Sequence, residues 1–171
     1  EELKKQLYVQ SKSYDEIIGL VKNKEVMLSS IPAIQPISNK QLRNLASGYG
    51  MRIHPIYKVK KFHTGIDFAA VRGTPIYATG DGIAYVPNNN DGYGNCIEIQ
   101  HGYGFMTRYG HCDKIKVKNG QHVKRGEIIG YVGSTGTATS PHLHYEVHRN
   151  GKFVNPIHYF FNDLNPKEYE E

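Results

Sequence analysis

Short apolar segments separated by glycine-containing turns fill the chain from about residue 37 to residue 160, and this pattern constrains the fold most. Five segments rich in β-branched and aromatic residues are predicted strands, at residues 83–86, 96–100, 105–111, 128–132 and 143–148. Gly102-Tyr103-Gly104 and Asn150-Gly151 are typical of hairpin turns. Strands this short, joined without helical crossovers, predict a mainly β body made of antiparallel sheet.

The first 28 residues are instead predicted to form an α-helix. A heptad seam runs along it: Leu3, Leu7, Gln10, Tyr14, Ile17, Val21, Lys24 and Leu28. Two of these eight positions are polar, so two arrangements fit, the end of a coiled coil or an amphipathic helix docked on the body. The heptad spacing favours the coiled-coil end.

Pro32 and Pro36 end the helical pattern and enforce an extended path. We therefore expect an N-terminal helix at residues 1–30, a Pro-containing linker at 31–37, a folded domain at 38–162 and a polar tail at 163–171. Because the chain starts at Glu1 inside a helical pattern, we expect an upstream segment, which would carry any export signal or membrane anchor.

Composition narrows the classes of partner. The net charge is +5 and the pI about 9.1, which suits an anionic partner or merely a basic solvated surface. The densest cationic stretch is residues 58–61, so we expect no nucleic-acid partner. No apolar run approaches the roughly 18–20 residues that span a bilayer.

The two cysteines, Cys96 and Cys112, form no Cys-x-x-Cys motif, which excludes a thiolate zinc site. They fall nearly opposite each other on neighbouring predicted strands, so a disulfide is geometrically possible. Directly opposed strand pairs often strain that bond, and two buried free thiols are the favoured state.

His142 and His144 lie one residue apart on a predicted strand and therefore point to the same face. One ring can hold a metal ion while the other moves a proton. Upstream, His63 and Asp67 are four residues apart, and Gly65 between them allows the backbone to bend so that both reach one ion. Two imidazoles and one carboxylate make a three-ligand zinc site with an open fourth position, as in catalytic sites.

Several ordered motifs resemble the M23 family of zinc peptidases, the lysostaphin-type or LytM-type peptidoglycan endopeptidases. The matching segments are residues 47–55, 63–70, 73–76, 80–82, 133–136, 141–147 and 154–156. The resemblance covers roughly residues 37–161 and leaves out the N-terminal helix. It implies an antiparallel β-sheet domain of the lysostaphin type behind that helix.

By position, the resemblance implies that His63, Asp67 and His144 bind one Zn²⁺ per chain and that His111 and His142 are catalytic. None of the five is replaced, whereas degenerate members of the family have lost ligands and serve as activators. The segment 137–140 reads Thr-Ala-Thr-Ser where many relatives carry Ser-Thr-Gly, a departure that bears on substrate fit.

The implied reaction is hydrolysis of the peptide cross-links of peptidoglycan, with stem peptides as substrate, through attack of a zinc-bound water assisted by two histidines. The resemblance does not assign which of His111 and His142 is the base. It implies a periplasmic, cell-envelope or extracellular location, with a possible anchor or protein partner upstream. A regulatory module acting through the coiled coil is the alternative. A purely structural zinc is disfavoured by the open position.

Three further residues have two readings each. Tyr109, two residues before His111, either donates a hydrogen bond at the site or packs in the sheet, and packing is favoured. Arg52 and His54 either line the substrate groove or form a turn before Pro55.

Overall fold

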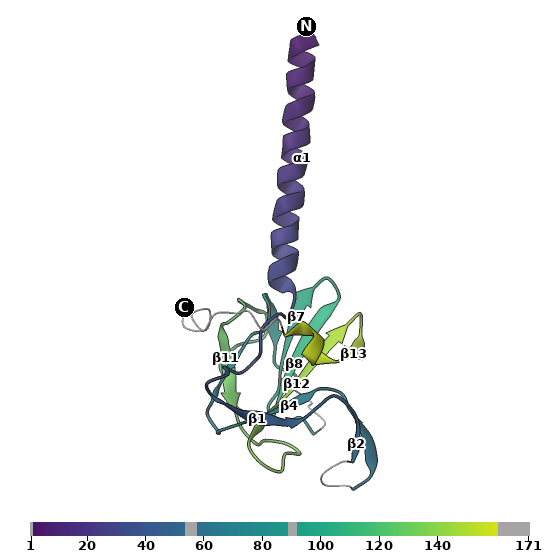
Figure 1. The fold of residues 1–171 in the computed structure, drawn as a ribbon. Coiled ribbons are helices and arrows are strands. Elements are labelled where there is room, and N and C mark those ends of the chain that lie inside the picture. The colour runs from purple at the N-terminus through teal and green to yellow at the C-terminus, as the bar shows by residue number, and fades with distance from the viewer. Residues whose placement is uncertain (1, 54–57, 89–91, 161–171) are drawn as a thin grey trace.

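A computed structural model describes residues 2–53, 58–88 and 92–160. The predicted tail at 163–171 and His54 lie outside these residues. Within them, a long N-terminal helix stands on a β body (Figure 1), so the predicted class is confirmed.

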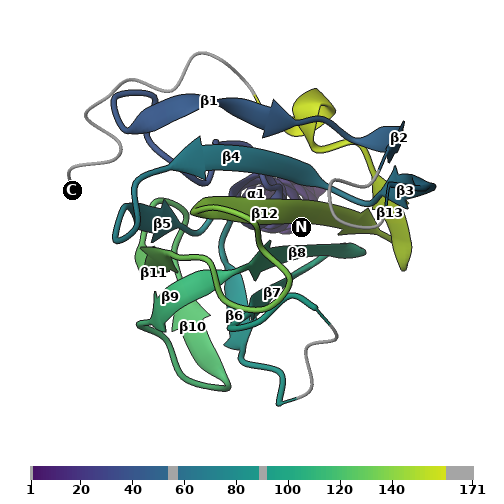
Figure 2. The same cartoon turned by 90° about the horizontal axis from the view of Figure 1, so that it is seen from below.

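The largest sheet is antiparallel, in the order β1-β4-β12-β8-β7-β6-β10, with β13 beside β12. Figure 2 shows β1, β4, β12 and β8 side by side, with α1 behind them. The bounds are α1 Glu2–Ser30, β1 Leu42–Ser47, β4 Ile66–Ala70, β6 Gly82–Tyr85, β7 Ile97–Gly102, β8 Phe105–Gly110, β10 Gln121–Val123, β12 His142–Arg149 and β13 Lys152–Val154.

Two smaller sheets complete the body. One has the order β5-β11-β9, and the other pairs β2 with β3. A short 3₁₀ helix, η1, follows the last strand. The bounds are β2 Gly50–Ile53, β3 Lys60–His63, β5 Pro75–Tyr77, β9 Cys112–Ile115, β11 Ile128–Val132 and η1 Pro156–Tyr159.

All five predicted strands are present, as β6, β7, β8, β11 and β12, with ends shifted by two residues or fewer. Both predicted hairpins are also present. Asn150 (φ 50°) and Gly151 (φ 74°) adopt the left-handed backbone that a two-residue hairpin of the primed type needs. Edge strand β1 escaped prediction because its middle four side chains are exposed, so no apolar alternation marks it.

Strand β12 is buried on both faces, and its two faces differ in chemistry. Leu143, Tyr145 and Val147 lie in the hydrophobic core. The alternate residues His144 and Glu146 are also buried, on the opposite face. One strand therefore contributes both to the core and to a buried polar cluster.

Helix α1 is confirmed, but it does not dock on the body along its length. Its seam residues Tyr14, Ile17 and Val21 are 65%, 52% and 52% exposed. Figure 1 shows the helix projecting away from the sheets. No described helix has an apolar stretch long enough to cross a bilayer. The coiled-coil pairing itself stays a prediction.

The proline-containing segment after the helix packs on the body. Ile34 and Ile37 are buried, and the Ala33 N–H donates to the Thr79 carbonyl (2.9 Å). The Asp81 N–H donates to the carbonyl of Ser29 in the last turn of α1 (2.8 Å). The helix is thus fixed to the domain at its C-terminal end.

The helix attaches at the end of the sheet opposite to His144 and His111. Asp81 also accepts, through its carbonyl, a hydrogen bond from His101 near the end of β7 (2.8 Å). Because β7 and β8 are antiparallel, that end pairs with the start of β8, whereas Gly110 and His111 follow at the other end. A six-residue strand spans about 20 Å, so α1 leaves the domain at the opposite end of the sheet.

Cys96 and Cys112 are buried free thiols, as favoured from the sequence. Burial raises the pKa of each thiol to about 12, so neither is a thiolate at neutral pH.

Candidate active site

Three strands bring together the residues with ligand chemistry. His63 ends β3, Asp67 lies in β4, and His144 lies in β12 directly opposite Asp67 in the antiparallel pairing. Gly65 permits this by close packing, because a Cβ at that position would lie 2.3 Å from the Tyr145 carbonyl oxygen. Glycine is therefore required at position 65 because only a residue without a side chain can pack this closely against β12.

The facing atoms of these three residues are evenly spaced. His63 Nε2 lies 3.1 Å from Asp67 Oδ1 and 3.1 Å from His144 Nδ1, and His144 Nδ1 lies 2.8 Å from Asp67 Oδ1. Ligand atoms bound tetrahedrally to zinc at ordinary distances lie about 3.3 Å apart. The three donors therefore fit the face of a tetrahedral zinc site, and all three residues are buried.

The outer nitrogen of each imidazole is held by an acceptor. His63 Nδ1 donates to the Gly48 carbonyl (2.7 Å), and His144 Nε2 donates to Glu146 Oε1 (3.0 Å). In a neutral ring the lone pair then sits on the inner nitrogen, facing Asp67. This is the tautomer that a histidine ligand needs, and such outer contacts commonly orient metal ligands.

Glu146, two residues after His144, was not predicted to belong to the site. Its side chain is fully buried, and hydrogen-bond donors surround its carboxylate and offset the cost of burying the charge. Those donors are Thr64 Oγ1, Tyr93 Oη (2.8 Å), Arg108 Nη1 (3.2 Å), His144 Nε2 (3.0 Å) and His148 Nε2 (2.9 Å). The signal available in the sequence was the alternation of His142, His144 and Glu146 along one strand.

The cluster favours charged carboxylates. Burial raises the pKa of the Asp67 carboxyl, but hydrogen bonds from His144 and His63 outweigh it and hold the pKa well below its usual range. Burial lowers the pKa of His144, but its bonds to Asp67 and Glu146 raise it to about 9. The triad thus attracts a positive charge, which in a metal site is the ion.

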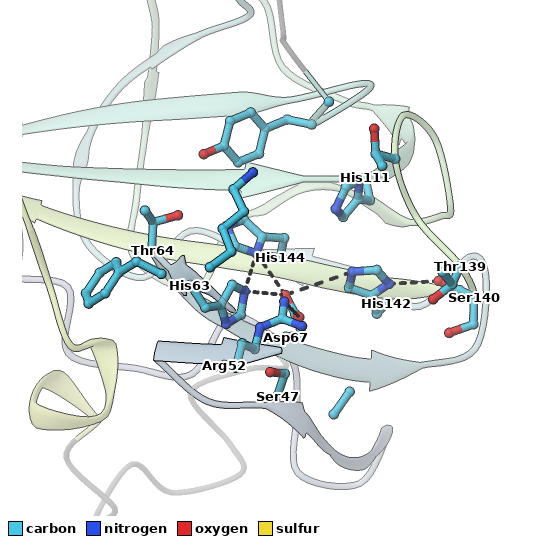
Figure 3. A pocket seen from close by; sticks show the side chains of 16 residues that line it. Ser47, Arg52, His63, Thr64, Asp67, His111, Thr139, Ser140, His142 and His144 are labelled. Carbon is cyan, nitrogen blue, oxygen red and sulfur yellow. Dashed lines mark hydrogen bonds and ion pairs between the residues drawn. The ribbon is translucent and has the colours of Figure 1, made fainter. Parts of the chain in front are cut away.

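His111 and His142 form a second pair beside the triad, with ring centroids 4.7 Å apart. Each donates Nδ1–H to a backbone carbonyl at 2.8 Å, His111 to Thr135 and His142 to Ser140. The lone pair of each neutral ring therefore sits on Nε2. That atom of His142 lies 3.9 Å from Asp67 Oδ1 (Figure 3), which places it against the triad.

His111 follows β8 in a left-handed backbone conformation (φ 62°), which is uncommon for a residue other than glycine and recurs at functional sites. Its N–H donates to the Tyr93 carbonyl (2.7 Å), which fixes this turn. Burial, with repulsion from His142 and His144, lowers the pKa of His111 to about 4. The ring is therefore neutral at pH 7 and able to accept a proton.

Both pairs of histidines line one groove of about 680 Å³. Segment 137–140, where the sequence departs from many relatives, contributes Thr137, Thr139 and Ser140 to its wall. Arg52 and Lys61 of the β2–β3 hairpin line it as well.

The structure also decides between the two interpretations of Arg52 and of Tyr109. Arg52 lines the groove and donates to Asp67 Oδ2 (3.1 Å), so the groove reading is correct for this residue. Tyr109 is buried, and its hydroxyl bonds to Thr79 and Thr107, so the favoured packing reading is correct.

Comparison with known proteins finds relatives and solved structures that are named as peptidases. The peptidoglycan DD-endopeptidase ShyA of Vibrio cholerae is 50% identical over 106 residues, covering 62% of this chain and 25% of the relative. A crystal structure of a zinc-containing peptidase from Vibrio cholerae has a TM-score of 0.64 at 42% identity, covering 70% of this chain and 37% of that one.

The catalytic domain of lysostaphin from Staphylococcus simulans has a TM-score of 0.61 at 34% identity, covering 70% of this chain and 91% of that domain. The chain spans about a quarter of the length of the curated relatives that it matches first. The model of peptidase family M23 matches residues 61–156, more than half of the chain. The chain therefore belongs to peptidase family M23.

Proposed function

We propose that this chain is a zinc-dependent endopeptidase that hydrolyses the peptide cross-links of bacterial peptidoglycan. One observation carries the proposal: three converging ligand atoms stand in a groove beside two further imidazoles whose Nε2 lone pairs are available. A structural metal would not need a groove or two uncommitted bases.

His63 Nε2, Asp67 Oδ1 and His144 Nδ1 are the proposed ligands of one zinc ion per chain. When bound, zinc supplies a Lewis acid that polarises a carbonyl and acidifies water. Gly48 and Glu146 hold the two rings in the ligating tautomer, and Arg52 holds the second oxygen of Asp67.

His111 and His142 are the proposed proton carriers. A base must lie within hydrogen-bond reach of the attacking water, and both rings border the triad with Nε2 open. One imidazole accepts the proton of the attacking water and returns it to the leaving amine. The other donates a hydrogen bond, when protonated, to the oxygen that becomes negative in the tetrahedral state.

The substrate class rests on the relatives. ShyA is named a peptidoglycan DD-endopeptidase, and we assign stem peptides to this chain by that likeness. Peptidoglycan lies outside the cytoplasmic membrane, so the proposed location is the periplasm or the outer cell envelope. The proposal also includes the domain boundaries expected from the sequence, which end the helix at residue 30 and the linker at residue 37.

The exposed seam of α1 supports a role as the end of a coiled coil that connects the domain to an anchor or a protein partner. The regulatory alternative gains nothing from the helix position, because α1 leaves the sheet at the end opposite to the groove. A coiled coil there recruits the domain and leaves the described groove open.

Digestion of purified peptidoglycan tests the proposal. The zinc-loaded protein should convert cross-linked dimers to monomers, and the masses of the products identify the cleaved bond. Addition of a chelator should stop the reaction. A zinc-loaded sample that releases no new peptides would contradict the proposal.

A further inference from the structure

The groove has a cationic end. Arg52 and Lys61 line it on the β2–β3 side, whereas Thr137, Thr139 and Ser140 line the side of the loop before β12. In Figure 3, Arg52 lies beside His63 and Asp67, and Thr139 and Ser140 lie beyond His142. Asp67 is the one carboxylate among the described lining residues, and it belongs to the triad.

Among the described residues, Asp67 is the one side chain that Arg52 pairs with. Its Nη2 donates to Asp67 Oδ2 (3.1 Å), and its side chain is 28% exposed. A guanidinium has five N–H donors in a planar fork that suits bidentate binding of a carboxylate. The Asp67 carboxyl group lies between the Arg52 guanidinium and the proposed zinc-binding atoms. A substrate group bound to Arg52 would therefore lie next to the scissile bond.

Lys61 reinforces the same positive charge. Arg52 and Lys61 are directly paired across the β2–β3 ladder, which places two like charges opposite each other. Such pairs are destabilising unless a counter-charge is bound. Within the described residues Lys61 forms no ion pair, and Asp67 is shared with His63 and His144. Within the described residues, Asp67 is thus the one carboxylate paired with the two cations of this hairpin.

We propose that this cationic end binds a free carboxylate of the substrate, and that Arg52 determines specificity for it. The inference rests on the proposed endopeptidase function and adds to it the charge of the residue beside the scissile bond. The residue on the acyl side uses its α-carboxyl in that bond. Where a side-chain amino group forms the cross-link and its carbon also carries a carboxylate, that carboxylate is free and lies two bonds from the scissile nitrogen.

Two synthetic peptides test this inference. They share one scissile amide and differ only at the α-carbon of the amine-side residue, which carries a carboxylate in one and a carboxamide in the other. Both are mixed with the zinc-loaded chain in a single reaction. The ratio of their cleavage rates does not depend on the fraction of active enzyme, so a partial loss of zinc leaves it unchanged.

The wild-type chain should prefer the carboxylate peptide by about tenfold or more, the usual effect of charge-assisted hydrogen bonds. Arg52→Gln should bring the ratio close to one, Arg52→Lys should keep part of the preference, and Lys61→Gln should lower it less. Lys60→Gln is the matched control, because Lys60 has the same charge in the same strand but does not line the groove. Its ratio should equal that of the wild type.

Equal cleavage of the two peptides by the wild type would overturn the inference. So would an Arg52→Gln variant that is slower on both peptides with the ratio unchanged, because Arg52 would then act on Asp67 alone. If neither peptide is cleaved, the endopeptidase proposal fails, and calorimetric binding of the same peptides decides the inference. Weaker binding of the carboxamide supports it, and equal binding overturns it.

Discussion

The four histidines of the groove form two pairs that differ in what holds them. His63 and His144 face Asp67, and the second of them is fixed by the buried Glu146 carboxylate. His111 and His142 are held through Nδ1 by the carbonyls of a loop, Thr135 and Ser140, and present Nε2 to the groove.

Under the proposed function, this difference gives one residue type two roles. A ring held so that its lone pair meets a carboxylate and another imidazole becomes a metal ligand. A ring whose lone pair is left next to that cluster becomes a proton carrier. His142 and His144 are two residues apart on one strand and fall on different sides of this division.

Removal of a ligand should have the largest effect. Asp67→Ala should lose zinc and all detectable hydrolysis, because two neutral imidazoles remain where three donors are needed. Metal analysis of the purified variant measures this directly. Asp113→Ala is the control, because Asp113 pairs with Arg72 and takes no part in the cluster. Full zinc content in the Asp67 variant would remove that residue from the ligand set.

Replacement in the second pair should separate metal from chemistry. His111→Asn keeps a residue that tolerates the left-handed backbone, and it should retain zinc while kcat falls about 10²- to 10⁴-fold. Zinc content and the rate of peptide release are measured on the same sample. His122→Asn, at an exposed histidine, should behave as wild type. A His111→Asn variant that cleaves at the normal rate would end its role as proton carrier.

Glu146→Gln should give an intermediate effect. The amide no longer holds the His144 ring as firmly, and zinc affinity should fall about 10- to 100-fold. A competition titration with a chromophoric chelator gives this affinity. Glu98→Gln removes a carboxylate that also bonds Arg108 but does not contact His144, so its affinity should stay unchanged. Equal losses in both variants would indicate a general packing effect.

The smallest effect concerns pH. Burial lowers the pKa of both His111 and His101 to about 4, against about 6.5 when unfolded. Between these values the unfolded chain binds more protons, so the free energy of unfolding should rise from pH 4 to pH 6.5. His101→Gln should flatten this rise and leave catalysis intact. Denaturant unfolding across this range measures the slope, and an unchanged slope would contradict the assignment.

The sequence singled out five residues because each belongs to a short motif, and the structure brings all five to one groove: His63, Asp67, His111, His142 and His144. Their roles stay proposals. The sequence also predicted the strands with clear apolar alternation. It did not predict Glu146 at the site or the contact of Arg52 with Asp67. These depend on strand pairing, of β12 with β4 and β8 around Glu146 and of β2 with β3 at Arg52. Partners such as Thr64 and Arg108 are far from Glu146 in sequence. Exposed strands such as β1 leave no periodic pattern to detect.

The central claim is that His63 and His144 bind the metal while His111 and His142 carry protons. Its most direct test compares His142→Ala with His144→Ala, two variants of nearby positions on β12. Zinc per chain and release of peptides from peptidoglycan are measured for both variants and for the wild type. The account predicts that His142→Ala keeps one zinc and loses hydrolysis, whereas His144→Ala loses both. Loss of zinc from His142→Ala, or hydrolysis by it at the wild-type rate, would contradict the division of the histidines.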